Sequence, residues 1–323
     1  MKRLAWSFVA WTLVGAILLL LGCTSKDIQR RNELISTVHE SSKLFSVHDM
    51  EKYLTHYADD FQWDPVSAPS RLSRSDFVAA ISNLPKNDPT LYHFQDKVLA
   101  SGNFAFYDGC SFVAKNPSTG IMYRTYHADI VEFSGLKIKV MTSFSDGAAT
   151  GVALGLIEPP LPEPPLPGTR SWPTAEPQPT KLKPLAAQKE SQARWNSHDV
   201  ASMAKMLHHD AKILISPLFD PVGREAYAAW MEIFFRAFPD LSVNATRTFD
   251  MGDGWVASEV KMAGTNTGSY LGHPATGKPI TLRAAYLGRY DANGLTTDLR
   301  LYFDSKAILG QLGLKPVTLA AQK

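Results

Sequence analysis

The same series of short motifs occurs twice in this chain, and this repetition constrains the fold more than any other feature. SVHDM at Ser46–Met50 is followed by PSTG and then by Asp146, while NSHDV at Asn196–Val200 is followed by PATG and then by Asp304. The paired motifs lie 150, 157 and 158 residues apart. Each motif is weak alone, but three of them in the same order indicate an internal duplication.

Proline residues concentrate between the two halves. Ten of the 21 prolines fall within residues 157–184. Proline fixes the backbone φ angle and lacks an N–H donor, so this segment cannot form a helix or an inner strand. We expect an extended linker of polyproline II type. A proline motif that binds a partner is the alternative, but the position between two halves favours a spacer.

The N-terminus has the pattern of an export signal. Lys2 and Arg3 precede a nearly charge-free apolar run over residues 4–21, which Gly22 and Cys23 close. A charged start before an apolar run is typical of a secretion signal. The segment LLGC resembles the bacterial lipobox, in which the signal is cut before the cysteine and lipid is attached to it. An uncleaved membrane helix is the alternative, since the run is about long enough to cross a bilayer.

The residues around the predicted lipidation site also bear on localisation and redox state. In bacterial lipoproteins the residue after the cysteine influences sorting, and Thr24, which is not an aspartate, favours the periplasmic side of the outer membrane in a cell with two membranes. Once Cys23 carries lipid, Cys110 is the single remaining thiol. We therefore expect no internal disulfide and a buried Cys110.

Composition predicts folded domains. Lys and Arg number 33 against 31 Asp and Glu, so no basic surface suggests a nucleic-acid partner. An apolar content of 45% fits globular cores, and 323 residues suffice for two domains. The expected organisation is a signal peptide (1–22), a lipidated N-terminus (23–26), a first domain (27–156), the linker (157–184), a second domain (185–316) and a tail (317–323).

Each half is expected to place its helices before its strands. Helical spacing of apolar residues predicts helices at residues 30–47, 50–61 and 75–84, and at 186–199, 200–211 and 224–238. Segments rich in β-branched and aromatic residues predict strands at 91–100, 104–114, 124–133 and 136–144, and at 241–250, 254–264, 280–290 and 296–303. This order predicts an α+β fold in each half, with helices on one face of an antiparallel sheet.

The second half resembles the SnoaL-like polyketide cyclases of the nuclear transport factor 2-like superfamily, from about residue 185 to 314. The segments that carry the resemblance are FPDL (Phe238–Leu241), GDGWVA (Gly252–Ala257), GTNTGSYLGHPATGKPI (Gly264–Ile280) and DSKAILGQLG (Asp304–Gly313). The first half resembles the same superfamily in general plan and is degenerate in its motifs. The resemblance implies two tandem cone-shaped α+β barrels, each a curved sheet wrapped around helices.

A cone of this kind commonly encloses a small apolar molecule, because its wide end is not always filled by side chains. We therefore expect a ligand cavity in the second half. Each aromatic candidate is also consistent with ordinary core. The candidate ligand-contacting residues are Tyr227, Trp230, Met231, Phe234, Trp255, Asn266, Arg283, Tyr286 and Tyr302.

Asp304 has two interpretations. The resemblance implies a general acid/base on the last strand for an aldol-type ring closure without metal or cofactor. Alternatively, Asp304 caps the short helix SKAILGQL, which Asp146 favours because it stands at the matching place in the degenerate half. Asn266 stands where the family often has histidine, and an amide can orient a carbonyl group but cannot exchange a proton near neutral pH.

Other polar clusters are weaker candidates. His208, His209 and Asp210 are expected at the end of a helix, where adjacent side chains diverge too far to hold one metal ion, so no metal site is expected. His127 and Asp129 alternate on one strand, and they either line the first cavity or form a surface pair. The glycines between residues 264 and 277 are typical of hairpin turns rather than of a phosphate-binding loop.

The sequence thus predicts a lipid-anchored envelope protein that follows one of two functions. The first is binding of a small hydrophobic molecule by the SnoaL-like half. The second is a cofactor-free cyclase or isomerase that uses Asp304, with Asn266, Tyr286 and Arg283 positioning the substrate. Expected partners are the ligand and the membrane, through lipid on Cys23. The two domains are expected to pair within one chain, with a homodimer as the alternative.

Overall fold

The computed structural model describes residues 5–83, 89–113, 115, 120, 122–153, 176–216 and 221–314, without the side chains of residues 5–24 and Tyr123. The predicted lipidation site at Cys23, the linker up to residue 175 and the tail at 317–323 therefore lie outside what is described. Among the residues whose side chains are described, from Ser25 onward, no helix has a stretch long and apolar enough to cross a bilayer.

The N-terminal domain places three helices against one face of a sheet. The strand order is β2-β1-β6-β5-β4-β3, with β1 parallel to β6 and the other neighbours antiparallel. Its elements are α1 (Ala5–Ser46), α2 (Met50–Thr55), β1 (Tyr57–Pro65), β2 (Leu72–Ser73), α3 (Arg74–Ser82), β3 (Leu91–Ser101), β4 (Phe104–Val113), β5 (Tyr123–Ser134), β6 (Lys137–Ser145) and α5 (Gly147–Ala153).

The C-terminal domain repeats this plan. Its strand order is β7-β11-β10-β9-β8, again with the first strand parallel to the last one. The matching order of helices and strands supports the internal duplication. The elements are α6 (Pro184–Asn196), α7 (Val200–Ala204), β7 (Leu207–Ile215), α8 (Arg224–Ala237), β8 (Ser242–Gly252), β9 (Trp255–Thr265), β10 (Pro279–Tyr290), β11 (Thr296–Tyr302) and α9 (Ser305–Leu312).

The repeated HD motif forms the same turn in both domains. His48 and His198 adopt left-handed backbone angles, with φ of 60° and 56°. The aspartate that follows each histidine accepts a hydrogen bond from the backbone of the next helix, Asp49 from Lys52 N and Asp199 from Ser202 N. The motif is therefore helix punctuation, because it ends one helix and caps the next.

Two predicted helices are wrong in their second parts. The helix expected at 50–61 ends at Thr55, and the one expected at 200–211 ends at Ala204; the strands β1 and β7 follow directly. Both strands pair with the last strand of their domain, β1 with β6 and β7 with β11. These partners lie far away in the chain, so local periodicity does not reveal the pairing.

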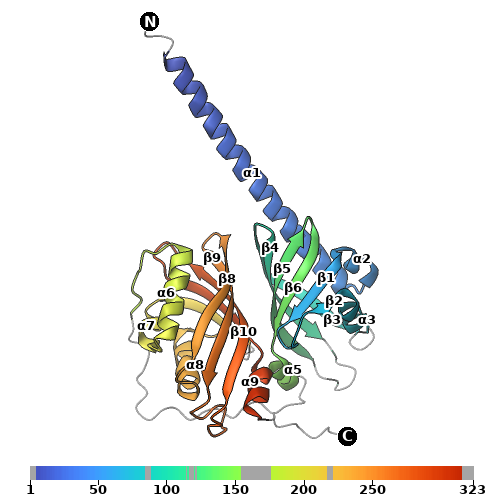
Figure 1. The fold of residues 1–323 in the computed structure, drawn as a ribbon, viewed down its shortest axis with the longest axis vertical. Coiled ribbons are helices and arrows are strands. Elements are labelled where there is room, and N and C mark those ends of the chain that lie inside the picture. Colours follow the sequence, from blue (N-terminus) through green and yellow to red (C-terminus); the bar gives the residue numbers. More distant parts are fainter. Residues whose placement is uncertain are drawn as a thin grey trace.

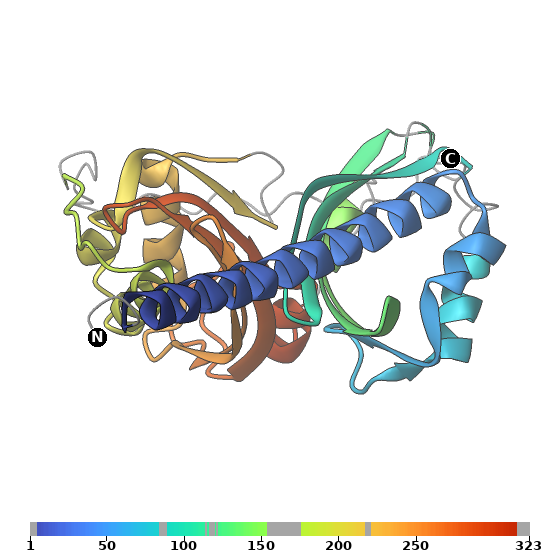
Figure 2. The same ribbon diagram turned by 90° about the horizontal axis from the view of Figure 1, so that it is seen from above.

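The three largest apolar cores of the described residues organise the molecule. One lies inside each domain, between its helices and the inner face of its sheet. The third joins residues from the outer faces of both sheets, among them Phe106, Ile130 and Phe144 of one domain and Trp255, Leu287 and Tyr302 of the other. Figures 1 and 2 show the two curved sheets facing each other, with α2, α3 and α8 on the far sides. The helices α5 and α9 meet beside this third core.

The described end of the predicted linker follows the C-terminal domain. Gln178 N donates to Lys205 O over 2.8 Å, and the backbone N–H groups of Thr180 and Lys181 donate to Asn293 O. Residues 176–183 have no regular secondary structure, as expected for this composition. Hydrogen bonds nevertheless fix this part of the linker to one domain.

Candidate functional site

A cavity of ligand size lies inside the N-terminal domain. It has a volume of about 350 Å³ and is bounded by α1, α2, α3 and the inner face of the sheet. Volumes of roughly 300–1,000 Å³ are typical of small-molecule sites. The lining is mainly apolar and aromatic, with a polar group on β3 to β6 that consists of His93, Tyr107, Ser111, His127, Asp129, Ser143 and Ser145.

Asp129 is the single carboxylate in this lining. Its exposed fraction is 6%, and burial raises its pKa to about 7, an effect that the Ser143 hydroxyl on the neighbouring strand partly offsets. Neither lysine nor arginine occurs among the described residues that line the cavity. A carboxyl group in such surroundings can gain or lose its proton near neutral pH.

Two histidines flank Asp129 on the sheet. Burial lowers the pKa of His127 to about 4, and burial together with His127 lowers the pKa of His93 well below its usual value. The two ring centroids are 5.1 Å apart, and Ser111 Oγ lies 2.8 Å from His93 Nε2. Both rings are therefore neutral at pH 7 and offer hydrogen-bonding nitrogens rather than positive charge.

Three tyrosines contribute hydroxyl groups. Tyr57 Oη donates to Tyr53 Oη over 2.5 Å. Tyr107 Oη is buried and has no hydrogen bond of normal geometry among the described residues, and its ring meets His127 edge-on at 5.4 Å. Burial is the largest cause that raises the pKa of all three hydroxyls, and nearby Asp129 adds to it. A buried hydroxyl without a partner is costly, so Tyr107 is suited to a polar group of a ligand.

The hollow exists because α3 is shorter and less bulky than its counterpart. α3 has 9 residues and buries Phe77 and Ile81, while α8 has 14 and buries Tyr227, Met231 and Phe234 among others. The rings of Trp230 and Phe234 stack at 5.1 Å in the same region. The longer, more aromatic α8 fills the C-terminal cone, whereas the shorter α3 leaves the N-terminal cone open.

Strand register reveals a second difference between the two cones. Ser143 pairs with Asp129 in one sheet, and Leu301, at the matching position three residues before the capping aspartate, pairs with Tyr286 in the other. Asp129 therefore corresponds to Tyr286, a large side chain that occupies the space. At these two matched inner positions, the side chains are small or polar in the N-terminal domain and large or apolar in the C-terminal one.

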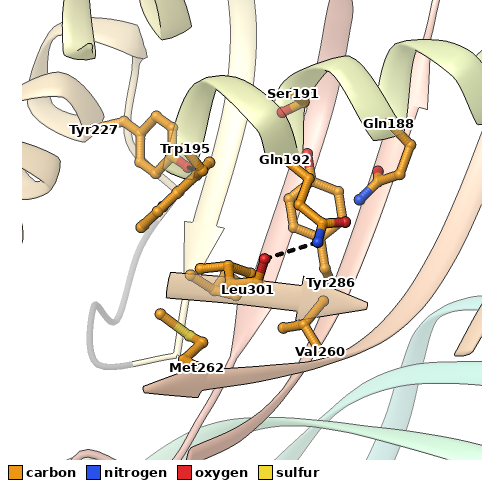
Figure 3. A pocket seen from close by; sticks show the side chains of 10 residues that line it. Gln188, Ser191, Gln192, Trp195, Tyr227, Val260, Met262, Tyr286 and Leu301 are labelled. Carbon is orange, nitrogen blue, oxygen red and sulfur yellow. Dashed lines mark hydrogen bonds between the residues drawn. The ribbon is translucent and has the colours of Figure 1, made fainter. Parts of the chain in front are cut away.

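The C-terminal cone, where the ligand cavity was expected, is nearly full. Its remaining space is about 30 Å³, room for one or two water molecules. Figure 3 shows Trp195 and Tyr227 beside Tyr286, Met262 and Leu301 around this space. Of the predicted ligand residues, Tyr227 and Tyr286 line it, whereas Trp230, Met231 and Phe234 belong to the surrounding core. The expectation of a ligand-sized cavity in this domain is therefore corrected.

Asn266 is fully buried and has a structural role. Its amide group donates to Ala237 O and Gly268 O, and its Oδ1 accepts from the N–H and the hydroxyl of Thr276. These four hydrogen bonds, between 2.8 and 3.2 Å, use the capacity of the side chain and hold the segment between β9 and β10. In this arrangement no donor or acceptor of Asn266 remains for a ligand.

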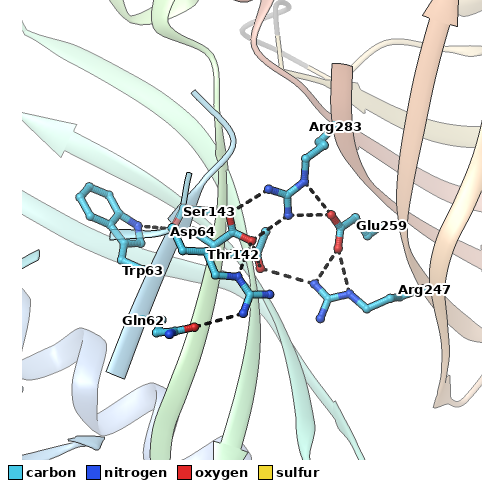
Figure 4. Close-up of polar contacts among 9 residues, drawn as sticks. Gln62, Trp63, Asp64, Thr142, Ser143, Arg247, Glu259 and Arg283 are labelled. Atoms are coloured by element: carbon cyan, nitrogen blue, oxygen red, sulfur yellow. Dashed lines mark hydrogen bonds and ion pairs between the residues drawn. The ribbon is translucent and has the colours of Figure 1, made fainter. Parts of the chain in front are cut away.

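Three predicted ligand residues point to the other domain instead. Arg283 forms a bidentate pair with Asp64 of β1, at 2.8 and 2.9 Å, and also contacts Glu259 (Figure 4). Tyr302 Oη donates to Asp108. Trp255 lies under Lys97 Nζ, 4.5 Å from the ring centroid. Strand alternation places these residues on the outer face, opposite to the cone interior.

Asp304 is the N-cap of α9 and lines neither of the two cavities. Its Oδ1 accepts hydrogen bonds from Lys306 N at 3.0 Å and from Gly147 N at 3.1 Å. Asp146 is matched to it, since its Oδ1 accepts from Ala148 N and from the hydroxyl of Ser305. The capping interpretation describes this geometry, and each aspartate in addition reaches the partner domain.

The remaining clusters do not form a site. His208, His209 and Asp210 lie on β7, not on a helix as predicted, and the described residues contain no group of three potential metal ligands in metal-binding arrangement. Gly268 lies so close to Arg236 O that an added Cβ would stand 2.1 Å from it, which accounts for a glycine there. Cys110 is fully buried, as expected.

The architecture defines a class of fold: two tandem α+β domains, each a sheet with helices on one face, as the sequence predicted. More narrowly, the family model of the SnoaL-like polyketide cyclases matches residues 186–312, which confirms the resemblance expected for the C-terminal half. No curated protein matches this chain.

Solved structures match parts of the chain at low identity. AclR from Streptomyces galilaeus is 22% identical over 40% of this chain and 80% of its own, with a TM-score of 0.37. IdmH from Streptomyces antibioticus is 22% identical over 41% of this chain and 100% of its own, with a TM-score of 0.37. An NTF2-like protein of unknown function from Burkholderia pseudomallei is 17% identical over 38% of this chain and 97% of its own, with a TM-score of 0.34.

Sequence reasoning found part of the N-terminal site. The alternation of His127 and Asp129 was noted, with a cavity as one of two interpretations, and the structure places both in the cavity. His93 and Tyr107 were missed, although both also lie on predicted strands. The pattern that indicates this site is the presence of imidazole and carboxyl groups at strand positions that face the helices.

Proposed function

We propose that this protein binds a small, largely apolar molecule in the cavity of its N-terminal domain. The observation that carries the proposal is the contrast between the two cones, about 350 Å³ in one and about 30 Å³ in the other. The open cone also holds the buried Asp129, two neutral histidines and the Tyr107 hydroxyl, which has no hydrogen bond of normal geometry among the described residues. Apolar walls with a few converging polar groups are typical of ligand sites.

The C-terminal domain has a supporting role in this proposal. Its outer sheet face covers the outer face of the N-terminal sheet through the third apolar core. We propose that the two domains of one chain thereby form the pair that separate copies of such domains would form as a homodimer. The filled cone of the C-terminal domain fits a supporting role, because it leaves no space for a ligand of similar size.

Binding can be tested with the neutral apolar dye N-phenyl-1-naphthylamine and the full-length chain in lipid nanodiscs. Ala80 lines the cavity at its exposed rim on α3, so Ala80→Trp should close the entrance without disturbing a buried position. Ala79, its exposed neighbour, does not line the cavity. We expect dye fluorescence with the parent chain and with Ala79→Trp, and its loss with Ala80→Trp. Equal fluorescence of all three would reject the proposal.

We further propose that lipid on Cys23 anchors the protein in the cell envelope. Cleavage before Cys23 would remove the outer part of α1, which extends away from both domains in Figure 1, and would leave Cys23 at the new start of this helix. In a bacterial host, a lipid label should be incorporated into the parent chain and not into Cys23→Ser. Label in both variants would contradict lipidation at this cysteine.

A second candidate function is cofactor-free proton transfer at carbon. A pKa of about 7 suits Asp129 to act as a general base and then as a general acid. Its carboxylate would take a proton from the carbon next to a substrate carbonyl and return it to another atom of the same molecule. Solvent deuterium incorporation into a bound ketone, lost in Asp129→Asn, would favour this function over binding alone; no incorporation by the parent chain would count against it.

A further inference from the structure

The charge content of the N-terminal cavity restricts what it can hold. Asp129 is the single side chain in the lining that can be charged near pH 7 without a large penalty, because His93 and His127 are held neutral and the tyrosine hydroxyls are held protonated. Among the described residues the lining offers no lysine or arginine as a counter-ion. A buried carboxylate without a counter-ion is unfavourable, and a cation beside it removes most of that cost.

The cavity that this single carboxyl group lines is also lined by several aromatic rings. Six of the lining residues are Phe, Tyr or Trp: Phe45, Tyr53, Tyr57, Trp63, Phe77 and Tyr107. Several are held by their neighbours, since the ring centroids of Phe77 lie 5.2 Å from Tyr57 and 5.3 Å from Trp63. Aromatic faces carry negative potential, and clusters of them recognise ammonium groups by cation–π attraction.

We infer that the ligand of this cavity is a small organic ammonium compound with an apolar body, paired with Asp129 and enclosed by the aromatic walls. The inference rests on the proposed binding function and adds the chemical class of the ligand. An anionic ligand would face the carboxyl group with no cation to compensate. A neutral ligand would leave the carboxylate without a counter-ion and would favour its protonated form.

The N-terminal cavity differs from the polar cluster on the outer face of the same sheet. Asp108 on β4 is also fully buried, but Arg300 pairs with it and Tyr302 donates to it. Burial raises the pKa of Asp108 to about 6, and Arg300 is the main opposing cause. Asp108 thus already has a cation from the other domain, whereas the described residues that line the cavity supply none to Asp129.

The test uses phenyltrimethylammonium and its neutral isostere tert-butylbenzene as competitors of N-phenyl-1-naphthylamine on the full-length chain in nanodiscs. The signal is the difference between the parent chain and Ala80→Trp, which cancels partition into lipid. The quaternary ammonium keeps its charge at every pH, so a pH effect reports the protein. We expect the ammonium to compete about tenfold or more better than the isostere at about pH 8. The preference should shrink at about pH 5.5, where Asp129 is protonated.

Asp129→Asn should abolish the preference while the dye still binds, and Asp108→Asn is the matched control that should keep it. If Asp129→Asn does not fold, Asp129→Leu, which removes the polar group altogether, takes its place. Equal competition by the two isosteres, or a preference that survives at Asp129→Asn, would overturn the inference and leave the binding function standing. Absence of dye binding to the parent chain would reject both.

Discussion

At the scale of single residues, two matched aspartates join the domains. Asp304 accepts hydrogen bonds from its own helix α9 and from Gly147 at the start of α5, and Asp146 accepts from α5 and from Ser305 at the start of α9. Burial raises the pKa of Asp146 to about 6, with the Ser305 hydroxyl as the main opposing cause. Two capping contacts that cross between domains explain why both halves keep an aspartate here.

Replacement of Asp304 tests this role. Asp304→Ala removes the acceptor for Lys306 N and Gly147 N, so we expect a loss of roughly 0.5–2 kcal/mol in the free energy of unfolding. Asp304→Asn keeps an oxygen acceptor and should lose less. Urea unfolding followed by tryptophan fluorescence measures both. An alanine variant as stable as the parent chain would contradict the capping role.

Asp129 makes stability depend on pH in a defined direction. Its pKa is about 7 in the folded protein and about 3.9 in an unfolded chain, so the folded state holds its proton longer. The raised pKa of Asp129 stabilises the folded state fully below about pH 4, and this contribution to the free energy of unfolding is lost as the pH rises through about 7. Asp129→Asn cannot lose a proton. Between these two pH values the free energy of unfolding of the parent chain should therefore fall by a few kcal/mol relative to that of the variant. Parallel curves of unfolding free energy against pH for the two chains would contradict the raised pKa of Asp129.

The sequence predicts which side chains share one face of a strand, but not whether that face points into the cone or away from it. His127 and Asp129 were placed on one face correctly, but that face could be assigned to a cavity only by the fold. Trp255, Arg283 and Tyr302 were expected near a ligand and lie on the outer face, because neighbouring residues of a strand point to opposite sides. Motif resemblance identifies a strand well and the direction of a side chain poorly.

At the scale of elements, α3 and α8 show how one plan gives two interiors. Both helices were predicted near their observed positions, at 75–84 and 224–238, against Arg74–Ser82 and Arg224–Ala237 in the structure. The volume of the side chains that α3 and α8 pack against their sheets decides which cone stays open, and α8 supplies more aromatic side chains than α3. The family resemblance was stronger for the C-terminal half, and the open cavity lies in the other one.

The contact between the sheets has an ionic part that a double-mutant cycle can measure. Asp64 is nearly buried and binds Arg283 through two hydrogen bonds, and Arg283 is the first cause that lowers the pKa of Asp64. We expect Arg283→Met to destabilise more than the combination of Asp64→Asn with Arg283→Met, with a coupling of roughly 1–3 kcal/mol. Urea unfolding of the four chains measures the coupling.

The exposed pair of Lys139 and Asp60 is the control for this cycle. Their side chains are 46% and 70% exposed and 3.2 Å apart. Solvent screens such a pair, so its coupling should be about 1 kcal/mol or less. Equal coupling at the two sites would mean that the contact between Asp64 and Arg283 does not form in solution.

At the scale of the whole molecule, ion pairs and apolar contacts on the outer faces of the two sheets join the domains. Each contributes a buried acid on its second antiparallel strand, Asp108 on β4 and Glu259 on β9, and arginines of the C-terminal domain pair with both. The apolar residues between these clusters form the third core, which neither domain could bury alone. Duplication followed by divergence explains this arrangement, in which both copies supply a contact surface and one of them has the larger cavity.

The oligomeric state in solution follows from this covered surface. A soluble form that begins at Ser25 keeps every side chain of the helices and sheets that the structure describes. Because the apolar outer faces of its two sheets already cover each other, no comparable sheet face remains for a second copy, and sedimentation equilibrium should give the mass of one chain at micromolar concentration. Leu287→Asp places a charge in the centre of the third core and should separate the domains, so this variant should expose apolar surface and self-associate. A parent chain that sediments only as a dimer, together with an unchanged Leu287→Asp variant, would show that the sheets do not pair within one chain.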